Sequence, residues 1–344
     1  MKLLFVHRKP RPYGNFSLES IYQVLTPLLE QQLSVNTWQA PAYSNGFWPR
    51  LNCLLSLRAY TKSKGADVVH VTGDVHFLLW GIAKGKRILT IHDIGFLHGK
   101  KGLKRAVLDY FWLSGPIQKA HAVTCVSEAT QSEILAVCPA AAGKLHVIPT
   151  IIDARFVRVD KPFHAARPTL LLLGSAPNKN LQRVLRATQG LDVHLSLVAE
   201  LGAAERALLQ GQSHEVCSRI SFEALLQKYQ EADAVVMCST HEGFGMPILE
   251  AQATGRVVLT SQCSSMPEVA GAGAYFVDPY SVDSIRAGIK TLCGDADLRH
   301  QLIAAGFENI QRFQPERVAQ QYIQLYKDVL ADYEFDPNQN LFEH

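Results

Sequence analysis

The sequence predicts an α/β fold made of two Rossmann-like, doubly wound domains. Three observations indicate this fold: short apolar runs that resemble buried strands, amphipathic stretches between those runs, and a chain long enough for two cores. The chain has 344 residues, of which 47% are hydrophobic, and a domain commonly holds about 100–150 residues. Strands that alternate with helices form parallel sheets with helices on both faces.

Ten short apolar runs are the expected strands, and most of them are bounded by Gly, Pro, Asp or Ser. Continuous apolar runs are typical of parallel strands, which are buried on both faces. In the first half of the chain, the runs are residues 3–6, 68–71, 88–91, 122–126 and 145–148. In the second half, they are residues 169–173, 193–198, 234–237, 257–260 and 275–277. The apolar spacing between them predicts helices, among them residues 18–31, 180–189, 222–231 and 281–292.

A polar segment that contains prolines, residues 160–168, marks the expected domain boundary, because a strand with four leucines follows it directly. We therefore expect a first domain over residues 1–163 and a second over residues 164–315. A long amphipathic helix, residues 316–334, is expected to pack back on the first domain, and residues 335–344 form a tail. Ligands of such sheets bind beyond the carboxyl ends of the strands, so we expect the active site in the cleft between the domains.

The two expected domains differ in charge. Residues 1–163 contain 20 basic and 10 acidic residues, a net charge of +10, whereas the remainder contains 14 basic and 21 acidic residues, a net charge of −7. This asymmetry suggests that the first domain meets an anionic partner. Residues 98–120 combine Lys and Arg with Leu, Val, Tyr, Phe and Trp, which suits a helix lying on an anionic membrane surface. An ordinary helix with a solvated basic face is the alternative, and no nucleic-acid-binding motif accompanies the charges.

The sequence has no run near the roughly 20 apolar residues that cross a bilayer, and its first apolar run is too short for a signal peptide. The seven cysteines are scattered, and no C-x-x-C motif occurs. We therefore expect reduced thiols in a cytoplasmic protein, one that can be peripheral on the inner face of the membrane.

The strongest functional signal is the stretch HEGFGMPILEA, residues 241–251. It follows an expected strand, so it lies at a carboxyl end, where ligands of parallel sheets bind. Gly243 and Gly245 allow positive φ and let a ligand approach the backbone, and Pro247 suits the first turn of a helix. The free N–H groups at such a helix start form an anion site that suits phosphate.

Two carboxylates flank this anion site. Glu242 precedes the glycine turn, and Glu250 lies in the helix that follows it. A carboxylate beside a phosphate can accept hydrogen bonds from hydroxyl groups. A phosphate group between two hydroxylated rings describes a nucleoside-diphosphate sugar. The alternative is a plain strand–turn–helix connection whose acidic residues favour the helix dipole.

The sequence EGFGMPILEA resembles the E-x7-E signature of the retaining glycosyltransferases of family 4, which have the GT-B fold of two Rossmann-like domains. Five further segments resemble other parts of that family in the same order. They are TIHDIGFLH (residues 90–98), VTCVSEATQSEI (123–134), HVIPTIID (146–153), LLLLGSAPNKNL (170–181) and SSMPEVAGAGAYFVDP (264–279).

The resemblance implies a role for each matching residue. Glu242 would contact the donor sugar, Glu250 the ribose hydroxyls, and His92 would reach the sugar from the first domain. Lys179 would neutralise the diphosphate, so that no metal ion or other cofactor is needed. The other implied donor-binding residues are Gly174, Ser175, Gly243, Phe244, Gly245 and Met246. The acceptor side would include Tyr13, Gly14 and Asn15.

The sequence departs from the family pattern in the phosphate loop. Family members often carry an arginine before the lysine, whereas Ser175 and Asn178 stand at those places here. Arg8, Arg11 or Arg256 are candidates to replace it. A D-x-D sequence at residues 295–297 is expected to begin a helix rather than to bind a metal.

Together these observations predict a metal-independent, retaining hexosyltransferase. It would move a sugar from a nucleotide sugar to a hydroxyl of a glycan or lipid-linked acceptor, in the biosynthesis of surface polysaccharide, lipopolysaccharide or glycolipid. Two alternatives stay open: a catalytically silent homologue that binds sugar nucleotide within a biosynthetic complex, and a nucleotide-sugar epimerase.

Overall fold

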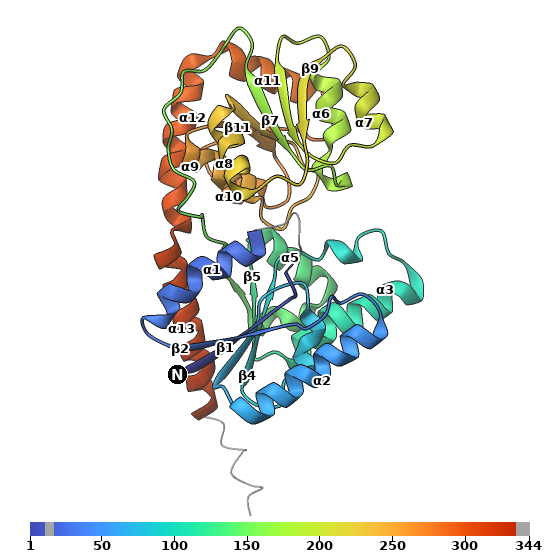
Figure 1. Ribbon diagram of the computed structural model, residues 1–344, viewed down its shortest axis with the longest axis vertical. Helices are drawn as coiled ribbons and strands as arrows, with labels where there is room; N and C mark the ends of the chain where they lie inside the picture. Colours follow the sequence, from blue (N-terminus) through green and yellow to red (C-terminus); the bar gives the residue numbers. More distant parts are fainter. Residues whose placement is uncertain (11–16, 335–344) are drawn as a thin grey trace, which may run out of the picture. The chain divides into compact units, whose positions relative to one another are not determined.

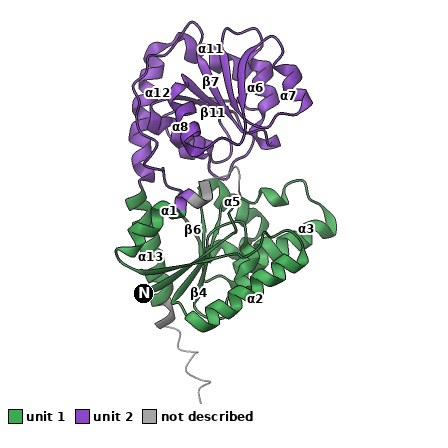
Figure 2. Ribbon diagram, viewed as in Figure 1, with its two compact units in different colours: residues 1–11, 22–149, 315–344 green, residues 12–21, 150–314 purple. Residues whose placement is uncertain are grey.

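A computed structural model describes residues 1–10 and 17–334 (Figure 1). Its contacts divide the chain into two compact units, which Figure 2 shows in separate colours. Among the described residues, unit 1 holds residues 1–10, 22–149 and 315–334, and unit 2 holds residues 17–21 and 150–314. Each unit has its own parallel sheet and its own apolar core.

The sheet of unit 1 has six parallel strands in the order β2-β1-β3-β4-β5-β6. Its inner residues, such as Leu4, Val69, Leu89 and Val123, are fully buried between covering helices. The strands are β1 (Lys2–His7), β2 (Ser34–Gln39), β3 (Val68–Val71), β4 (Lys86–Ile91), β5 (Ala122–Cys125) and β6 (Leu145–Val147).

Five helices follow the strands of unit 1 along the chain, and a long C-terminal helix joins them. They are α1 (Ser17–Glu30), α2 (Phe47–Lys64), α3 (Gly102–Asp109), α4 (Gly115–Lys119), α5 (Glu128–Val137) and α13 (Pro315–Glu334). The short turns are η1 (His76–Gly81), η2 (Gly95–Leu97), η3 (Tyr110–Ser114) and η4 (Pro139–Lys144). A buried hydrogen bond of 2.8 Å between His70 of β3 and Tyr326 fixes α13 against the sheet.

Unit 2 repeats the architecture with the strand order β12-β11-β10-β7-β8-β9, again all parallel. The strands are β7 (Thr169–Leu173), β8 (His194–Val198), β9 (Ser213–Cys217), β10 (Ala234–Met237), β11 (Val257–Ser261) and β12 (Tyr275–Val277). The helices are α6 (Leu181–Thr188), α7 (Ala203–Leu208), α8 (Phe222–Glu231), α9 (Met246–Thr254), α10 (Met266–Ala270), α11 (Val282–Gly294) and α12 (Ala296–Asn309). The short turns are η5 (Pro177–Lys179) and η6 (Ile310–Phe313).

The predicted fold class is confirmed, and each of the ten expected runs coincides with a strand. The sequence missed two strands, β2 and β9, which are edge strands of their sheets. Their residues are largely exposed or half-buried, so they lack the continuous apolar runs of the inner strands. Asp295 begins α12 as expected, since its side chain accepts a hydrogen bond of 2.9 Å from the Leu298 amide.

Within residues 1–10 and 17–334, no helix combines the length and the apolar character that crossing a bilayer requires.

Candidate donor site

The candidate site lies in unit 2, where β7 and β10 end. These strands are neighbours in the sheet, so the loops that follow them meet at one edge. The amide of Thr240 donates a hydrogen bond of 2.8 Å to the carbonyl oxygen of Asn178 and joins the two loops. The sequence predicted both loops as parts of one donor site, and the fold brings them together.

The loop after β7 turns sharply at Gly174, whose φ is 82°. A Cβ atom at this position would lie 3.3 Å from Cγ of Lys179, so the lysine side chain passes directly over the glycine. Asn180 ends the loop in the left-handed conformation, and its Nδ2 donates to the carbonyl oxygens of Cys238 and Pro279. Ser175 donates to the Glu200 carbonyl oxygen at 2.5 Å.

The charged centre of the site is an ion pair between the two loops. Nζ of Lys179 lies 2.8 Å from Oε1 of Glu242, and both side chains are largely shielded from solvent. Nδ2 of Asn178 donates to the carbonyl oxygen of His241 at 3.0 Å and approaches Oε1 of Glu242 at 3.4 Å. Asn178 therefore links the loops without adding a charge to the site.

The glycine turn leads directly into α9. Gly245 has a φ of 103° and precedes the first helical residue, Met246, and Pro247 lies in the first turn. The hydroxyl of Ser265 donates to the carbonyl oxygens of Glu242 and Phe244 and holds the turn in place. The helix ends at Gly255, which is left-handed with a φ of 76°. The predicted helix start is thus formed.

The side chain of Phe244 points away from the glycine turn to which its backbone belongs. Its side chain is buried and contacts the ring of Phe313 edge to face, at a centroid distance of 5.6 Å. Only its backbone belongs to the glycine turn, and the predicted use of the amides around this residue stays a prediction.

Glu250 is buried inside unit 2 and is bonded to Tyr229. The tyrosine hydroxyl, on α8, donates a short hydrogen bond to Oε2 of Glu250. Burial raises the pKa of Glu250 to about 7, although the Tyr229 hydrogen bond and the charge of Lys179 act in the opposite direction. The predicted contact of Glu250 with ribose hydroxyls stays a prediction, and a ribose would share this carboxylate with Tyr229.

Sequence reasoning missed Tyr229 as a member of the site. It lies in an amphipathic helix, is fully buried, and contacts the ring of Phe156 at a centroid distance of 5.3 Å. A tyrosine on the inner face of a helix is indistinguishable in sequence from an ordinary core residue. Only the packing of α8 against α9 reveals its hydroxyl as a partner of Glu250.

The prediction that Arg256 could replace the missing phosphate-loop arginine is wrong. Arg256 precedes β11, so it lies at the amino end of the strands, opposite to the site. Its guanidinium is buried and donates to the carbonyl oxygens of Thr254, Ala232 and Val159. Arg8, in unit 1, pairs with Asp74 at 3.1 Å.

Four other residues that the sequence analysis assigned to the site are not described by the structure. Arg11 and the expected acceptor residues Tyr13, Gly14 and Asn15 lie outside the described residues.

His92, in unit 1, follows the carboxyl end of β4. Its Nε2 donates to the carbonyl oxygen of Thr72 at 3.3 Å, which leaves Nδ1 as a hydrogen-bond acceptor. Burial lowers the pKa of His92 to about 4, against the opposing effects of the Thr72 hydrogen bond and the charge of Asp93. The imidazole is therefore neutral near pH 7. Asp93 forms a turn, since it accepts a hydrogen bond of 2.8 Å from the Gly95 amide.

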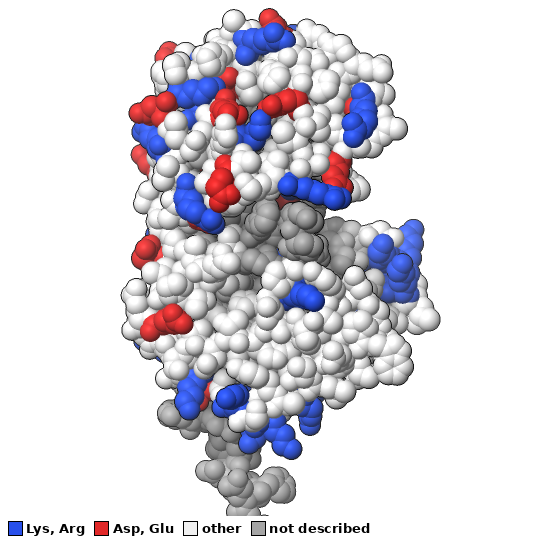
Figure 3. Space-filling view, in the orientation of Figure 1, with Lys and Arg blue, Asp and Glu red and all other residues white. Residues whose placement is uncertain are grey.

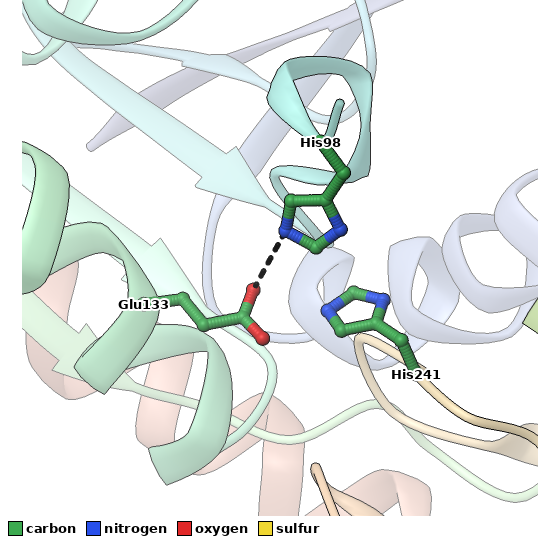
Figure 4. A group of neighbouring side chains, drawn as sticks. All are labelled: His98, Glu133 and His241. Carbon is green, nitrogen blue, oxygen red and sulfur yellow. Dashed lines mark ion pairs between the residues drawn. The ribbon is translucent and has the colours of Figure 1, made fainter. Parts of the chain in front are cut away.

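A second group of polar residues in unit 1 is the pair of His98 and Glu133 (Figure 4). Nε2 of His98 lies 4.0 Å from Oε2 of Glu133 on α5. The third residue in the figure, His241, belongs to unit 2. Within unit 1 the two residues make a pair, which is fewer than the three protein ligands that hold a typical zinc ion.

The fold and the site together define the class of protein. Two doubly wound parallel sheets, with a cation, two carboxylates and a glycine turn at the carboxyl ends of one sheet, describe a protein with the GT-B fold. Residues 23–156 match the family model described as Glycosyltransferase Family 4, and residues 167–309 match the model described as Glycosyl transferases group 1. The chain belongs to glycosyltransferase family 4.

Individual relatives agree with this assignment. The chain is similar to the MMP alpha-(1->4)-mannosyltransferase of Mycolicibacterium hassiacum, with 27% identity over 220 residues, 60% of this chain and 54% of that protein. It is also similar to the O-antigen chain mannosyltransferase B of Escherichia coli, with 38% identity over 105 residues, 30% of this chain and 28% of that protein. The chain thus spans about half the length, or less, of these relatives.

A solved structure shares the fold of almost the whole chain. HepE of Anabaena, in complex with UDP and glucose, has a TM-score of 0.73 at 17% identity. The match covers 95% of this chain and 100% of that chain.

Proposed function

We propose that this protein transfers a hexose from a nucleoside-diphosphate sugar to an acceptor hydroxyl, with retention of configuration and without a metal ion. The ion pair between Lys179 and Glu242 carries the proposal, because it places a cation and a carboxylate where two loops and the start of α9 meet. The HepE complex with UDP and glucose supports a nucleotide and a sugar as ligands of this fold.

Each part of the site has one proposed role. Lys179 and the N–H groups at the start of α9 bind the diphosphate. Glu242 binds hydroxyls of the sugar, and Glu250, with Tyr229 beside it, binds the ribose. Lys179 and these N–H groups stabilise the negative charge that develops on the leaving diphosphate.

The proposed reaction replaces one bond at the anomeric carbon by another. The bond from that carbon to the diphosphate oxygen breaks, and a bond to the acceptor oxygen forms on the same face of the ring. The leaving diphosphate takes the acceptor proton. His92, neutral near pH 7, would contact the sugar from unit 1.

We further propose that the acceptor is a glycan or a lipid-linked glycan, in the assembly of surface polysaccharide, lipopolysaccharide or glycolipid. The similarity to an O-antigen chain mannosyltransferase supports this class of acceptor. In this proposal unit 1, which carries most of the basic residues, binds the acceptor.

A donor screen tests the proposed function. Isothermal titration calorimetry against a panel of nucleotide sugars should find one donor that binds the wild type, and nuclear magnetic resonance of the product should show retained configuration. Glu242→Gln should lower transfer by at least about tenfold, since it removes a charged hydrogen bond to the sugar. Glu215→Gln is the matched control, because Glu215 is also bonded to a lysine of unit 2, Lys228, at 2.5 Å.

Three outcomes would contradict the proposal in different ways. Full transfer by Glu242→Gln would remove the assigned role of this carboxylate. Tight donor binding without any turnover would favour the silent homologue, a reading that the uncharged Ser175 and Asn178 also support. Conversion of the donor sugar without an acceptor would indicate an epimerase.

A further inference from the structure

Helix α3 and the turn after it have an apolar stripe on the outside of unit 1. Leu103, Val107 and Phe111 follow at helical spacing and are 81%, 45% and 46% exposed. The opposite stripe, Leu108 and Trp112, packs against the core of unit 1. A surface helix normally presents polar residues to water, so the outer apolar stripe is unusual and is typical of an interaction surface.

The start of α2 carries two further exposed aromatic side chains. Phe47 and Trp48, which contact each other edge to face, are 69% and 75% exposed. They lie one turn or less from Arg50, whose guanidinium stacks on the ring of Trp112 at 4.5 Å. The first turn of α2 and the turn η3 are therefore neighbours in unit 1.

Basic residues border the apolar stripe. Lys100, Lys101 and Lys104 are exposed and lie in or directly before α3. Figure 3 shows Lys and Arg side chains gathered over this region of unit 1, at the right of the view, with no acidic side chain among them on this face. Apolar and aromatic side chains framed by lysines match the two layers of an anionic membrane surface, which are acyl chains and negative headgroups.

We propose that the surface formed by Phe47, Trp48, Leu103, Val107 and Phe111, with Lys100, Lys101 and Lys104, docks this protein on an anionic lipid bilayer. The charge complementarity distinguishes this occupant from a second copy of the chain, whose corresponding surface is equally basic. The surface contains none of the residues of the donor site, so membrane docking and the proposed function can be tested independently.

Co-sedimentation with vesicles tests the proposal. The wild type should bind vesicles of 70% phosphatidylcholine and 30% phosphatidylglycerol at low salt, and should be released by about 0.5 M salt, which shortens the range of electrostatic attraction. Leu103→Ser with Val107→Ser should abolish most of the binding. Lys100→Ser with Lys101→Ser should weaken it by about 25-fold, since each basic residue near the surface contributes about a factor of five.

Matched variants keep the test specific. Val157→Ser with Val216→Ser removes two exposed valines of unit 2, and Lys290→Ser with Lys327→Ser removes two exposed lysines elsewhere; both should bind vesicles like the wild type. Circular dichroism should show all variants folded. Absence of wild-type binding, equal binding by the Leu103 and Val107 variant, or a concentration-dependent dimer that this variant abolishes would overturn the proposal.

Discussion

Lys179 and Glu242 form an ion pair of 2.8 Å that joins the loop after β7 to the loop after β10. Both side chains are proposed to serve one donor, the lysine through the diphosphate and the glutamate through the sugar. A donor that binds in this way competes with Glu242 for the lysine. The two residues should therefore respond differently to a ligand that carries the diphosphate alone.

The first prediction separates these two roles. Lys179→Met should weaken the binding of a free nucleoside diphosphate by about 10- to 100-fold, the loss expected for a charged hydrogen bond. Glu242→Gln should leave that affinity unchanged or raise it, because it removes the competing partner of Lys179. Calorimetric titration of both variants measures the difference. Equal losses in the two variants would mean that the carboxylate does not compete.

The second prediction concerns the pH dependence of unit 2. The pKa of Glu250 is raised to about 7 in the folded chain by burial, against about 4.3 in an unfolded chain. The folded state therefore holds a proton that the unfolded state has lost, and stability falls as the pH rises from about 4.5 to 7. The free energy of unfolding should fall by about 3 kcal/mol over this range, at 1.36 kcal/mol per pKa unit.

Glu250→Gln should remove this dependence, since an amide oxygen still accepts the Tyr229 hydrogen bond but never ionises. We expect the variant to be more stable than the wild type at pH 8 and similar at pH 5. Urea unfolding followed by circular dichroism measures this, because all four tryptophans lie in unit 1. Parallel pH profiles for the variant and the wild type would contradict the prediction.

The third prediction concerns the acid stability of unit 1. His70 is fully buried between Tyr326 and Thr90, at 2.8 and 2.7 Å. Burial chiefly, with smaller effects of His7 and His92, lowers the pKa of His70 to about 3. The unfolded chain binds this proton first, so stability is lost as the pH falls from about 6.5 to 3, by about 2 kcal/mol at pH 5.

His70→Gln should be less stable than the wild type at pH 8, because the buried hydrogen bond to α13 is disturbed. Its free energy of unfolding should change less between pH 7 and pH 5 than that of the wild type. Tryptophan fluorescence during urea unfolding reports on unit 1. An acid dependence as steep as that of the wild type would show that other groups, and not His70, set the acid stability.

Much of the fold was predictable because the inner strands are buried on both faces and are therefore continuous apolar runs. The edge strands β2 and β9 were not predictable, because their exposed positions carry polar residues such as Ser, Asn, His and Glu. Likewise the glycine turn at Gly245 and the cap at Gly255 follow from residue type, because both positions take left-handed backbone.

The contacts between side chains of the site were harder to predict from the sequence. Lys179 and Glu242 were assigned to one donor site, but their contact depends on β7 and β10 being neighbours in the sheet. The bond of Tyr229 to Glu250 depends on two helices that pack together. The error over Arg256 was avoidable, because a residue directly before a parallel strand lies at the edge opposite to the ligand.

The fourth prediction tests the glycine turn itself. Gly245 has a φ of 103°, and a Cβ atom there would lie 3.2 Å from Cε of Met237 and 3.3 Å from Cδ1 of Ile248. Gly245→Ala should therefore cost about 1–3 kcal/mol of stability and displace the start of α9, lowering donor affinity by about tenfold or more. Gly211→Ala is the control, since Gly211 is also left-handed, with a φ of 77°, but a Cβ atom there would have no neighbour within 4 Å. The Gly211→Ala variant should lose stability through backbone strain alone and should keep normal donor affinity in calorimetry. An unchanged donor affinity in Gly245→Ala would show that donor binding does not depend on this turn.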